Sequence, residues 1–193
     1  KIKDIVIDED NRPVSFTWPG REGEPPLKIN IGGDGPLQTK VLRDALFRFA
    51  DTLTDAGNSY EAVTSVLYQD CPRIDGRGTG EFIIDESKKA LPQVIDAVAG
   101  LDNSHVFIQG PPGSGKTWIG ARVIAEMVKR GFRVGVSSNS HKAINHLLRE
   151  VEKVAKKKKI RFRGAKKAFS GNPDSFLDGD IIDDVTKNDE LLD

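Results

Sequence analysis

The 193-residue chain carries 29 Lys and Arg against 29 Asp and Glu, and 37% of its residues are apolar. This length suits one ordinary domain, or one domain with a small appendage, and such a core folds without covalent cross-links. Cys71 is the one cysteine of the sequence, which excludes a disulfide framework and a cysteine-based metal site. Apolar runs of only a few residues exclude a membrane-spanning helix. No secretory segment opens the chain, so we expect it in the cytoplasm.

The zero net charge conceals three blocks of different sign. Residues 1–127 carry 14 basic and 19 acidic side chains, residues 128–167 carry 14 and 2, and residues 168–193 carry 1 and 8. The middle block, with a net charge of +12, is as basic as many surfaces that bind nucleic acids. Overall neutrality therefore does not exclude an anionic partner.

The first 84 residues predict a small accessory region of strands and a helical pair. Apolar runs broken by turn-forming residues favour short strands, and apolar residues at helical spacing favour helices. Asn58 and Glu61 form a capping pair that would open the second helix. The strands are expected at 3–7, 14–18 and 27–31, the helices at 39–56 and 58–69, and a loop at 71–81.

From residue 85 to residue 170 the chain predicts a regular alternation of helices and strands. The helices are expected at 86–100, 116–130 and 140–158, and the strands at 105–109, 132–137 and 159–162. Gly131 is expected to end the second of these helices. This order predicts an α/β fold with a parallel sheet flanked by helices. Residues 171–193 are expected to form a poorly ordered acidic tail.

Residues 110–117 carry the clearest functional signal, which is a phosphate-binding loop. Gly-Pro-Pro-Gly-Ser-Gly-Lys-Thr matches the Walker A pattern G-x-x-x-x-G-K-[ST], between an apolar strand and an amphipathic helix. Glycines let backbone N–H groups face phosphate oxygens, and the start of the helix favours negative charge. Lys116 would bind the β- and γ-phosphates, and the Thr117 hydroxyl would bind Mg²⁺. The candidate nucleotide-binding residues are Gly110, Pro111, Pro112, Gly113, Ser114, Gly115, Lys116 and Thr117.

A second polar block follows one helix later, where a strand ends in Ser137 and Ser138 and a helix then begins. Together with the phosphate loop, this block resembles superfamily 1 helicases of the up-frameshift type, most of all bacterial helicase modules fused to a RecB-like nuclease. The resemblance covers about residues 90–165. It identifies the block as motif Ia, which holds the phosphates of single-stranded DNA or RNA, so Ser138, Asn139, Ser140 and His141 are candidate nucleic-acid contacts. A plain capping cluster with Ser140 as the cap is the alternative.

The resemblance also implies a RecA-like P-loop core that binds ATP and Mg²⁺, with Lys116 and Thr117 as catalytic groups. The parent protein would be a longer helicase, which would couple ATP hydrolysis to translocation. Helicases of this class carry an upstream glutamine that reads adenine. Gln93, seventeen positions before Gly110, is the candidate, and a surface glutamine is the alternative.

Hydrolysis in that family needs an acidic pair after a later strand. Two apolar stretches that end in acidic residues, at 5–10 and 82–87, precede the phosphate loop and so come too early. Residues 181–184 (IIDD) follow the loop, but they lie in an acidic segment that also fits a solvated tail. We therefore expect a piece of a longer helicase that ends before the catalytic acid and binds nucleotide with little or no turnover.

Residues 156–167 hold eight basic side chains in twelve positions, either as a contact for nucleic acid or as a solvated helix end. Two other functions stay open. A P-loop ATPase of AAA+ or transport type would bind nucleotide without responding to single strands. A non-catalytic nucleic-acid-binding module with a vestigial phosphate loop would ignore ATP.

Overall fold

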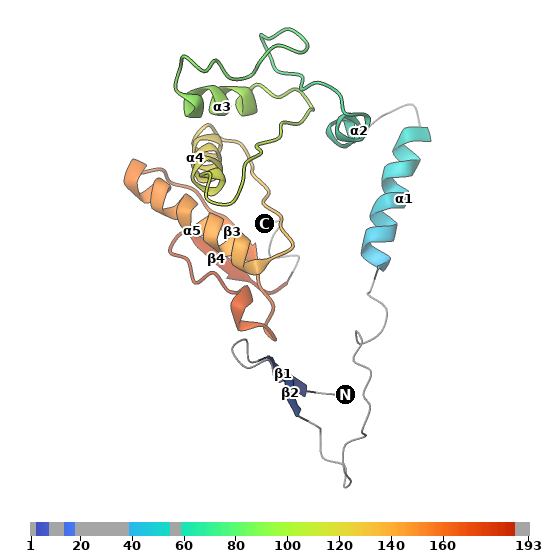
Figure 1. The fold of residues 1–193 in the computed structure, drawn as a ribbon, viewed down its shortest axis with the longest axis vertical. Coiled ribbons are helices and arrows are strands. Elements are labelled where there is room, and N and C mark those ends of the chain that lie inside the picture. The colour runs from blue at the N-terminus through green and yellow to red at the C-terminus, as the bar shows by residue number, and fades with distance from the viewer. Residues whose placement is uncertain (1–2, 8–13, 18–38, 55–58, 188–193) are drawn as a thin grey trace. The chain divides into compact units, whose positions relative to one another are not determined.

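The computed structural model describes residues 3–7, 14–17, 39–54 and 59–187. Helices and strands are mixed along the chain, with one pair of parallel strands near its C-terminal end (Figure 1). The chain divides into two compact units, Lys1–Arg48 and Phe49–Asp193. The positions expected for boundaries, after residues 84 and 170, both lie inside the second unit.

The first unit contains an antiparallel hairpin of β1 (Lys3–Ile7) and β2 (Val14–Thr17). Ile7 pairs with Val14 at the closed end, and the register shifts once between Lys3 and Ile5. These strands confirm the first two that the sequence predicts. The third expected strand, at 27–31, lies outside the described residues.

Helix α1 (Lys40–Thr54) confirms the helix predicted over 39–56, although residues 55 and 56 lie outside the described part. None of its residues is buried. Its apolar side chains are strongly exposed, with Val41 at 77% and Leu46 at 68%. The apolar residues whose spacing predicted this helix are therefore not part of a core within the described chain.

Helix α2 (Glu61–Tyr68) is shorter than the helix predicted over 58–69, and Asn58 of the expected capping pair lies outside the described residues. Ser65 is the buried residue of this helix. Its hydroxyl forms a 3.1 Å hydrogen bond with Nδ1 of His105, in the segment that leads into the phosphate loop. This bond attaches α2 to that segment.

Helix α3 (Ala90–Ala99) begins four residues later than the helix predicted over 86–100. Pro92 explains the difference. It occupies the third position of α3, where a backbone N–H has no intrahelical partner, whereas a start at residue 86 would place it in the helix interior. Residues 85–88 instead form a turn, in which the Asp85 carboxylate accepts bonds from Ser87 N (3.0 Å) and Ser87 Oγ (2.6 Å).

Helices α4 (Lys116–Lys129) and α5 (His141–Lys158) match their predicted ranges closely and form the main helix pair. Small residues let them approach, since Ala125 and Ala155 are fully buried and pack with Val154 and Ile160. On the opposite side of α4, buried apolar residues face α3, namely Val123 and Met127 with Ile95. The pair thus forms the centre of the second unit.

Each helix of this pair ends in a left-handed residue. Gly131 has φ of +89°, and Phe132 N–H donates to Met127 O (3.0 Å), which confirms the predicted glycine stop after α4. After α5 the left-handed residue is Lys159, with φ of +55°, and Ile160 N–H donates to Ala155 O (2.9 Å). The prediction of a strand at 159–162 is therefore wrong, because residues 159 and 160 form the end of α5.

The strand after α5 is β3 (Gly164–Lys167), which pairs in parallel with β4 (Ile182–Val185). Gly164 lies opposite Ile182, and a Cβ there would lie 2.9 Å from the isoleucine side chain. A short 3-10 helix, η1 (Pro173–Ser175), lies between the strands. The segment expected to be a poorly ordered tail thus contains ordered structure up to residue 187, while residues 188–193 lie outside the described part.

The strands predicted at 105–109 and 132–137 are not formed. Both segments lack ladder hydrogen bonds in the described part of the chain. Apolar side chains that a sheet would bury are exposed, including Phe107 at 74% and Phe132 at 51%. A strand requires a neighbouring strand, and no described segment lies beside either one in register. The parallel sheet of the described chain is therefore the β3–β4 pair alone.

The two unhindered glycines that flank residues 132–134 allow a matched stability test. Gly131→Ala should lower the free energy of unfolding by about 1 kcal/mol, because alanine is strained at positive φ. Gly135→Ala should change it by less than about 0.5 kcal/mol, since its added Cβ meets no atom within 4 Å and its φ is not positive. Urea denaturation would measure both. Equal effects would contradict the left-handed stop.

Candidate nucleotide-binding site

The backbone of the predicted phosphate loop requires its glycines. Gly113 and Gly115 have φ of +80° and +84°, a conformation that strains any residue with a Cβ. At Gly110, a Cβ would lie against the Ser114 side chain, which would have to shift. Ser114 N–H donates to Pro111 O (3.2 Å) and closes the turn. The glycine spacing of the motif therefore follows from the shape of this loop.

The loop ends at an open helix start. Gly115 is the N-cap of α4, and no side chain caps the helix there. The first N–H groups of a helix have no intrahelical partner and carry a partial positive charge. An anion held by the loop would therefore meet donors that the helix itself leaves unused.

The Lys116 side chain lies back across the loop. Its ammonium group donates to Gly110 O (2.5 Å) and Pro111 O (2.7 Å). Two neutral carbonyls hold the cation at the loop without neutralising its charge. Phosphate oxygens could replace them as stronger, charged acceptors.

A cavity of about 450 Å³ lies against the loop. The loop and the start of α4 line one side of it, with Pro112, Gly113, Gly115, Lys116, Thr117 and Trp118. On the other side, α5 contributes His146 and Glu150. These two residues were not predicted from the sequence, although their four-residue spacing on a helix indicates that they share one face.

Glu150 places a negative charge in this cavity. Lys153 Nζ lies 2.6 Å from its carboxylate, and this hydrogen bond lowers the pKa of Glu150 below its ordinary value of 4.5, helped by the charges of His146 and Arg122. Arg122 stacks 3.6 Å above the Trp118 ring centroid. The cavity wall therefore combines a carboxylate with nearby cations, which suits a metal-bound phosphate better than a bare one.

A second cavity, of about 280 Å³, joins the two predicted motifs. Lys116 and Thr117 line it together with Ser137 and Ser138, the serines at the end of the extended segment. Apolar residues complete its wall: Val136, Ala143, Ile144 and Leu147, with Gly120 beside them. The structure therefore brings Thr117 and Ser138 to the same cavity.

The four candidate nucleic-acid contacts have different surroundings. Ser140 caps α5, because its Oγ accepts from Ala143 N (3.3 Å), and its own N–H donates to Ser138 Oγ (3.3 Å). The capping role considered from the sequence is thus confirmed for Ser140. Asn139 is exposed, and the His141 ring packs edge-on against Phe169, 5.5 Å between centroids.

Gln93, the candidate adenine reader, binds the turn before α3. Its Oε1 accepts from Asp85 N (2.7 Å), and its Nε2 donates to Asp85 O and Lys89 O (both 3.1 Å). It does not line either cavity beside the phosphate loop. The structure therefore does not bring Gln93 together with Lys116 and Thr117, and its carboxamide is occupied by backbone groups.

Part of the basic block is paired with the acidic segment that follows. Lys156 forms an ion pair with Asp180, and Lys166 Nζ lies 3.9 Å from Asp184 Oδ1. Lys158 Nζ lies 3.9 Å from Glu126 on α4. Five further cations of the block have no ion-pair partner within the described residues: Lys157, Lys159, Arg161, Arg163 and Lys167, of which Lys167 donates to Thr186 O.

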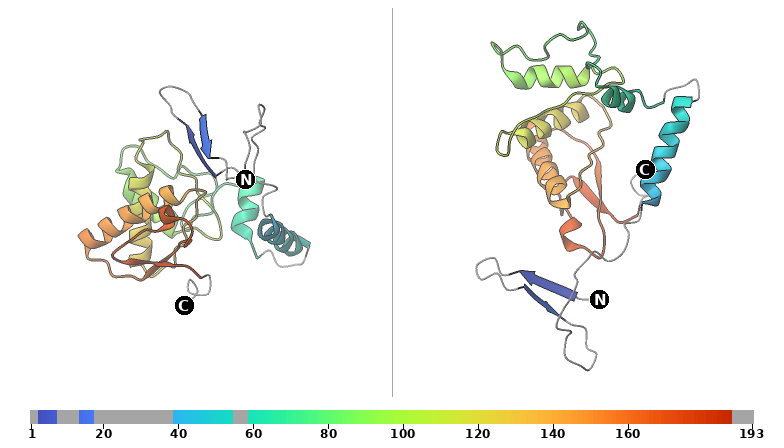
Figure 2. Two further views of the ribbon diagram at one scale, coloured as in Figure 1. Left: turned by 90° about the horizontal axis from the view of Figure 1, so that it is seen from below. Right: turned by 45° about the vertical axis from the view of Figure 1, so that its right-hand side comes forward.

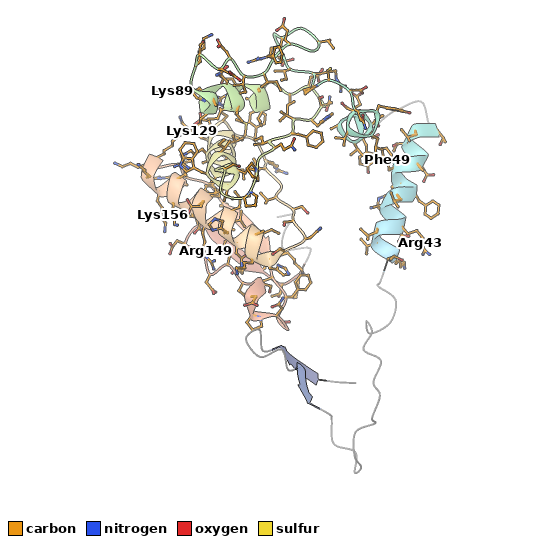
Figure 3. All side chains as sticks on the ribbon, in the orientation of Figure 1. Arg43, Phe49, Lys89, Lys129, Arg149 and Lys156 are labelled. Carbon is orange, nitrogen blue, oxygen red and sulfur yellow. The ribbon has the colours of Figure 1, made fainter. Side chains whose placement is uncertain are left out.

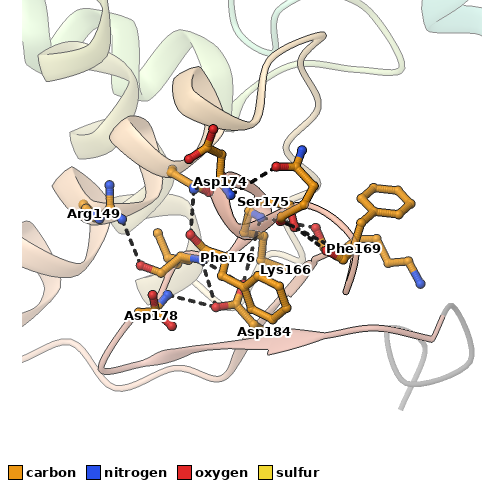
Figure 4. Close-up of polar contacts among 12 residues, drawn as sticks. Arg149, Lys166, Phe169, Asp174, Ser175, Phe176, Asp178 and Asp184 are labelled. Atoms are coloured by element: carbon orange, nitrogen blue, oxygen red, sulfur yellow. Dashed lines mark hydrogen bonds and ion pairs between the residues drawn. The ribbon is translucent and has the colours of Figure 1, made fainter. Parts of the chain in front are cut away.

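Of the two acidic residues at 181–184, Asp184 holds the fold. The Asp184 carboxylate accepts from Leu177 N (2.8 Å) and Asp178 N (2.9 Å), close to Lys166 (Figure 4). Helix α5 holds the same segment through Arg149, which donates to Leu177 O (3.1 Å). Figure 3 labels Arg149 and Lys156 on this helix. Neither Asp183 nor Asp184 lines a cavity at the phosphate loop.

Asp85, which Gln93 holds by its backbone, provides a pH test of this region. Hydrogen bonds from Ser87 and the nearby Lys88 lower the pKa of Asp85 from 3.8 to about 2. The charged form is thus favoured in the fold, and this contribution to stability is present above pH 3.8 and lost as the pH falls towards 2. NMR titration of Asp85 should give a midpoint near 2, and Ser87→Ala should raise it. A midpoint that Ser87→Ala leaves unchanged would contradict the turn.

Comparison with protein-family models, curated proteins and solved structures gave no match. Among the described residues, no helix is both long and apolar enough to cross a membrane. The same residues contain no cluster of three or more His, Cys, Asp or Glu side chains that could hold a metal by themselves. Among the described residues, the features that bear on function are the phosphate loop and its two cavities.

Proposed function

We propose that this chain binds Mg·ATP through residues 110–117, as the ATP-binding part of a superfamily 1 helicase core of RecA-like fold. The observation that carries the proposal is the loop itself. Its glycines adopt left-handed conformations, its lysine lies on loop carbonyls, and it opens directly into an uncapped helix. Each of these features would favour the binding of a polyphosphate.

In this proposal Lys116 leaves the carbonyls of Gly110 and Pro111 and binds the β- and γ-phosphates, while the N–H groups at the start of α4 bind the phosphate oxygens. The available donor set fits Mg²⁺, which prefers oxygen ligands and keeps several waters. The Thr117 hydroxyl would hold the ion, and the Glu150 carboxylate shares the cavity with it. The ion would neutralise the phosphate charge that Glu150 otherwise repels.

The partner we propose is single-stranded DNA or RNA, bound by Ser138, Asn139 and His141. The support is the cavity that Ser138 shares with Thr117, which places the two candidate sites next to each other. A nucleotide on Thr117 and a strand on Ser138 would therefore influence one another. The cations of the basic block without ion-pair partners would add affinity that falls with rising salt.

We expect little or no ATP hydrolysis by these residues alone. Hydrolysis requires a carboxylate that positions the metal and the attacking water. Among the described residues, Glu150 is the one acidic side chain that lines the phosphate cavity, and it is held by Lys153. The expected activity is therefore binding rather than turnover.

Calorimetric titration with Mg·ADP would test the proposal. The wild-type protein should bind, and Lys116→Ala should weaken binding at least about tenfold, since it removes the cation that meets the phosphates. Lys129→Ala is the matched control, because Lys129 lies in the last turn of the same helix and should leave binding unchanged. Equal affinity of the wild type and Lys116→Ala would refute the assignment.

The Glu150→Gln variant tests the role of the metal ion in nucleotide binding. Without Mg²⁺ the variant should bind ADP severalfold more tightly than the wild type, because an anionic carboxylate no longer faces the phosphates. With Mg²⁺ this advantage should disappear, so the gain in affinity on adding metal should shrink. The two titrations, run in EDTA and in Mg²⁺, measure this difference. An identical gain in both proteins would show that Glu150 does not face the bound phosphates.

A further inference from the structure

An exposed aromatic residue, Phe169, lies beside the candidate nucleic-acid contacts. It follows the end of β3 by two residues, and β3 lies beside α5 (Figures 1 and 2). Its ring is 53% exposed, and the ring centroid is 5.5 Å from that of His141, the first residue of α5. The ammonium of Lys167 lies 5.9 Å from the same centroid. An exposed ring is thus combined with a cation and with a residue that we propose to contact a strand.

The backbone of Phe169 is firmly held although its ring is exposed. Its N–H donates to the hydroxyl of the fully buried Ser175 (2.7 Å), and Asn172 N–H donates to Phe169 O (2.9 Å). Asn145 of α5 holds the next turn by donating to Asp174 O (3.1 Å). In Figure 4 the Phe169 ring lies outside this cluster of hydrogen bonds. The fold therefore fixes the position of an aromatic ring that its buried apolar clusters do not include.

The surroundings of Phe169 favour an anionic ligand that carries aromatic groups. The ring lines a groove of about 600 Å³ together with His141. The charged residues that line this groove are all basic: Arg133, Arg163, Lys166 and Lys167. Phe162 lines it as well, but it packs against two buried clusters, which leaves Phe169 as the exposed ring next to His141. Single strands of DNA and RNA bind to such surfaces, because they combine an anionic backbone with the π-faces of their bases.

We propose that the Phe169 ring stacks on a base of the single strand whose phosphates contact Ser138 and Asn139, and that Lys167 binds a phosphate next to that base. This inference rests on the proposed function, because it takes single-stranded DNA or RNA as the partner. The strand would extend from the start of α5 to the end of β3. Because every base has a π-face, the stacking would tolerate any sequence.

Fluorescence anisotropy with two labelled strands of equal length would test the stacking. The strands are oligothymidine of twelve nucleotides and an abasic strand with the same backbone, and the wild-type protein should bind oligothymidine more tightly. Phe169→Ala should weaken oligothymidine binding at least about fivefold and leave binding of the abasic strand unchanged. Phe82→Ala is the matched control, because Phe82 is also exposed, at 94%, and lines neither this groove nor the cavities at the phosphate loop.

Further variants separate stacking from charge. Phe169→Trp should keep the affinity for oligothymidine, whereas Phe169→Leu should lose it, because an aliphatic side chain has no π-face. Phe169→Ala should leave the salt dependence of binding unchanged, since stacking releases no counterion. Lys167→Gln should instead reduce the slope of log K against log salt concentration by about 0.7, the contribution of one phosphate contact in a single strand.

The outcomes distinguish the stacking from the partner. Binding of oligothymidine that Phe169→Ala and Phe169→Leu leave unchanged would overturn the stacking and keep the single-strand partner. Equal binding of oligothymidine and the abasic strand by the wild type would do the same, without relying on a variant. If the wild type binds neither oligothymidine nor oligouridine, the partner is refuted and the stacking with it. A dimer in sedimentation that Phe169→Ala dissociates would assign the ring to a second copy of the chain.

Discussion

The packing of α4 against α5 is the constraint on which the rest of the second unit depends. Ala125 and Ala155 are fully buried, so larger residues at these positions would force the helices apart. The starts of the two helices carry the phosphate loop and the serine cluster. Their close approach therefore determines that Thr117 and Ser138 line one cavity, and that His146 and Glu150 face the loop.

The polar residues of α5 organise the chain that follows it. Asn145 donates to Asp174 O (3.1 Å) and Phe176 O (2.9 Å), and the buried Glu152 accepts from Ile181 N (2.8 Å) and Ile182 N (2.9 Å). With Arg149 between them, these residues lie on one face at helical spacing. A buried carboxylate is costly unless it is hydrogen-bonded, so Glu152 fixes the turn before β4. The backbone of residues 174–182 is thus held by α5.

Local chemistry explains where the predictions from sequence succeeded. Gly131 ends α4 because only glycine adopts its backbone conformation without strain. Ser140 caps α5 because its hydroxyl accepts a hydrogen bond from the backbone N–H three residues later. The Walker A glycines follow the same logic. Predictions failed where a distant partner decides, as for the strands at 105–109 and 132–137. Apolar alternation shows that a segment can form a strand, but the ladder also needs a neighbour.

The sequence by itself determined the helices α4 and α5, their ends, and the loop that could hold a phosphate, since each depends on residues a few positions apart. Tertiary structure alone decided that Glu150 faces that loop and that Thr117 and Ser138 line one cavity. These facts depend on which segments pack together. Such packing is set by the combined shape of α4 and α5, which no short pattern encodes.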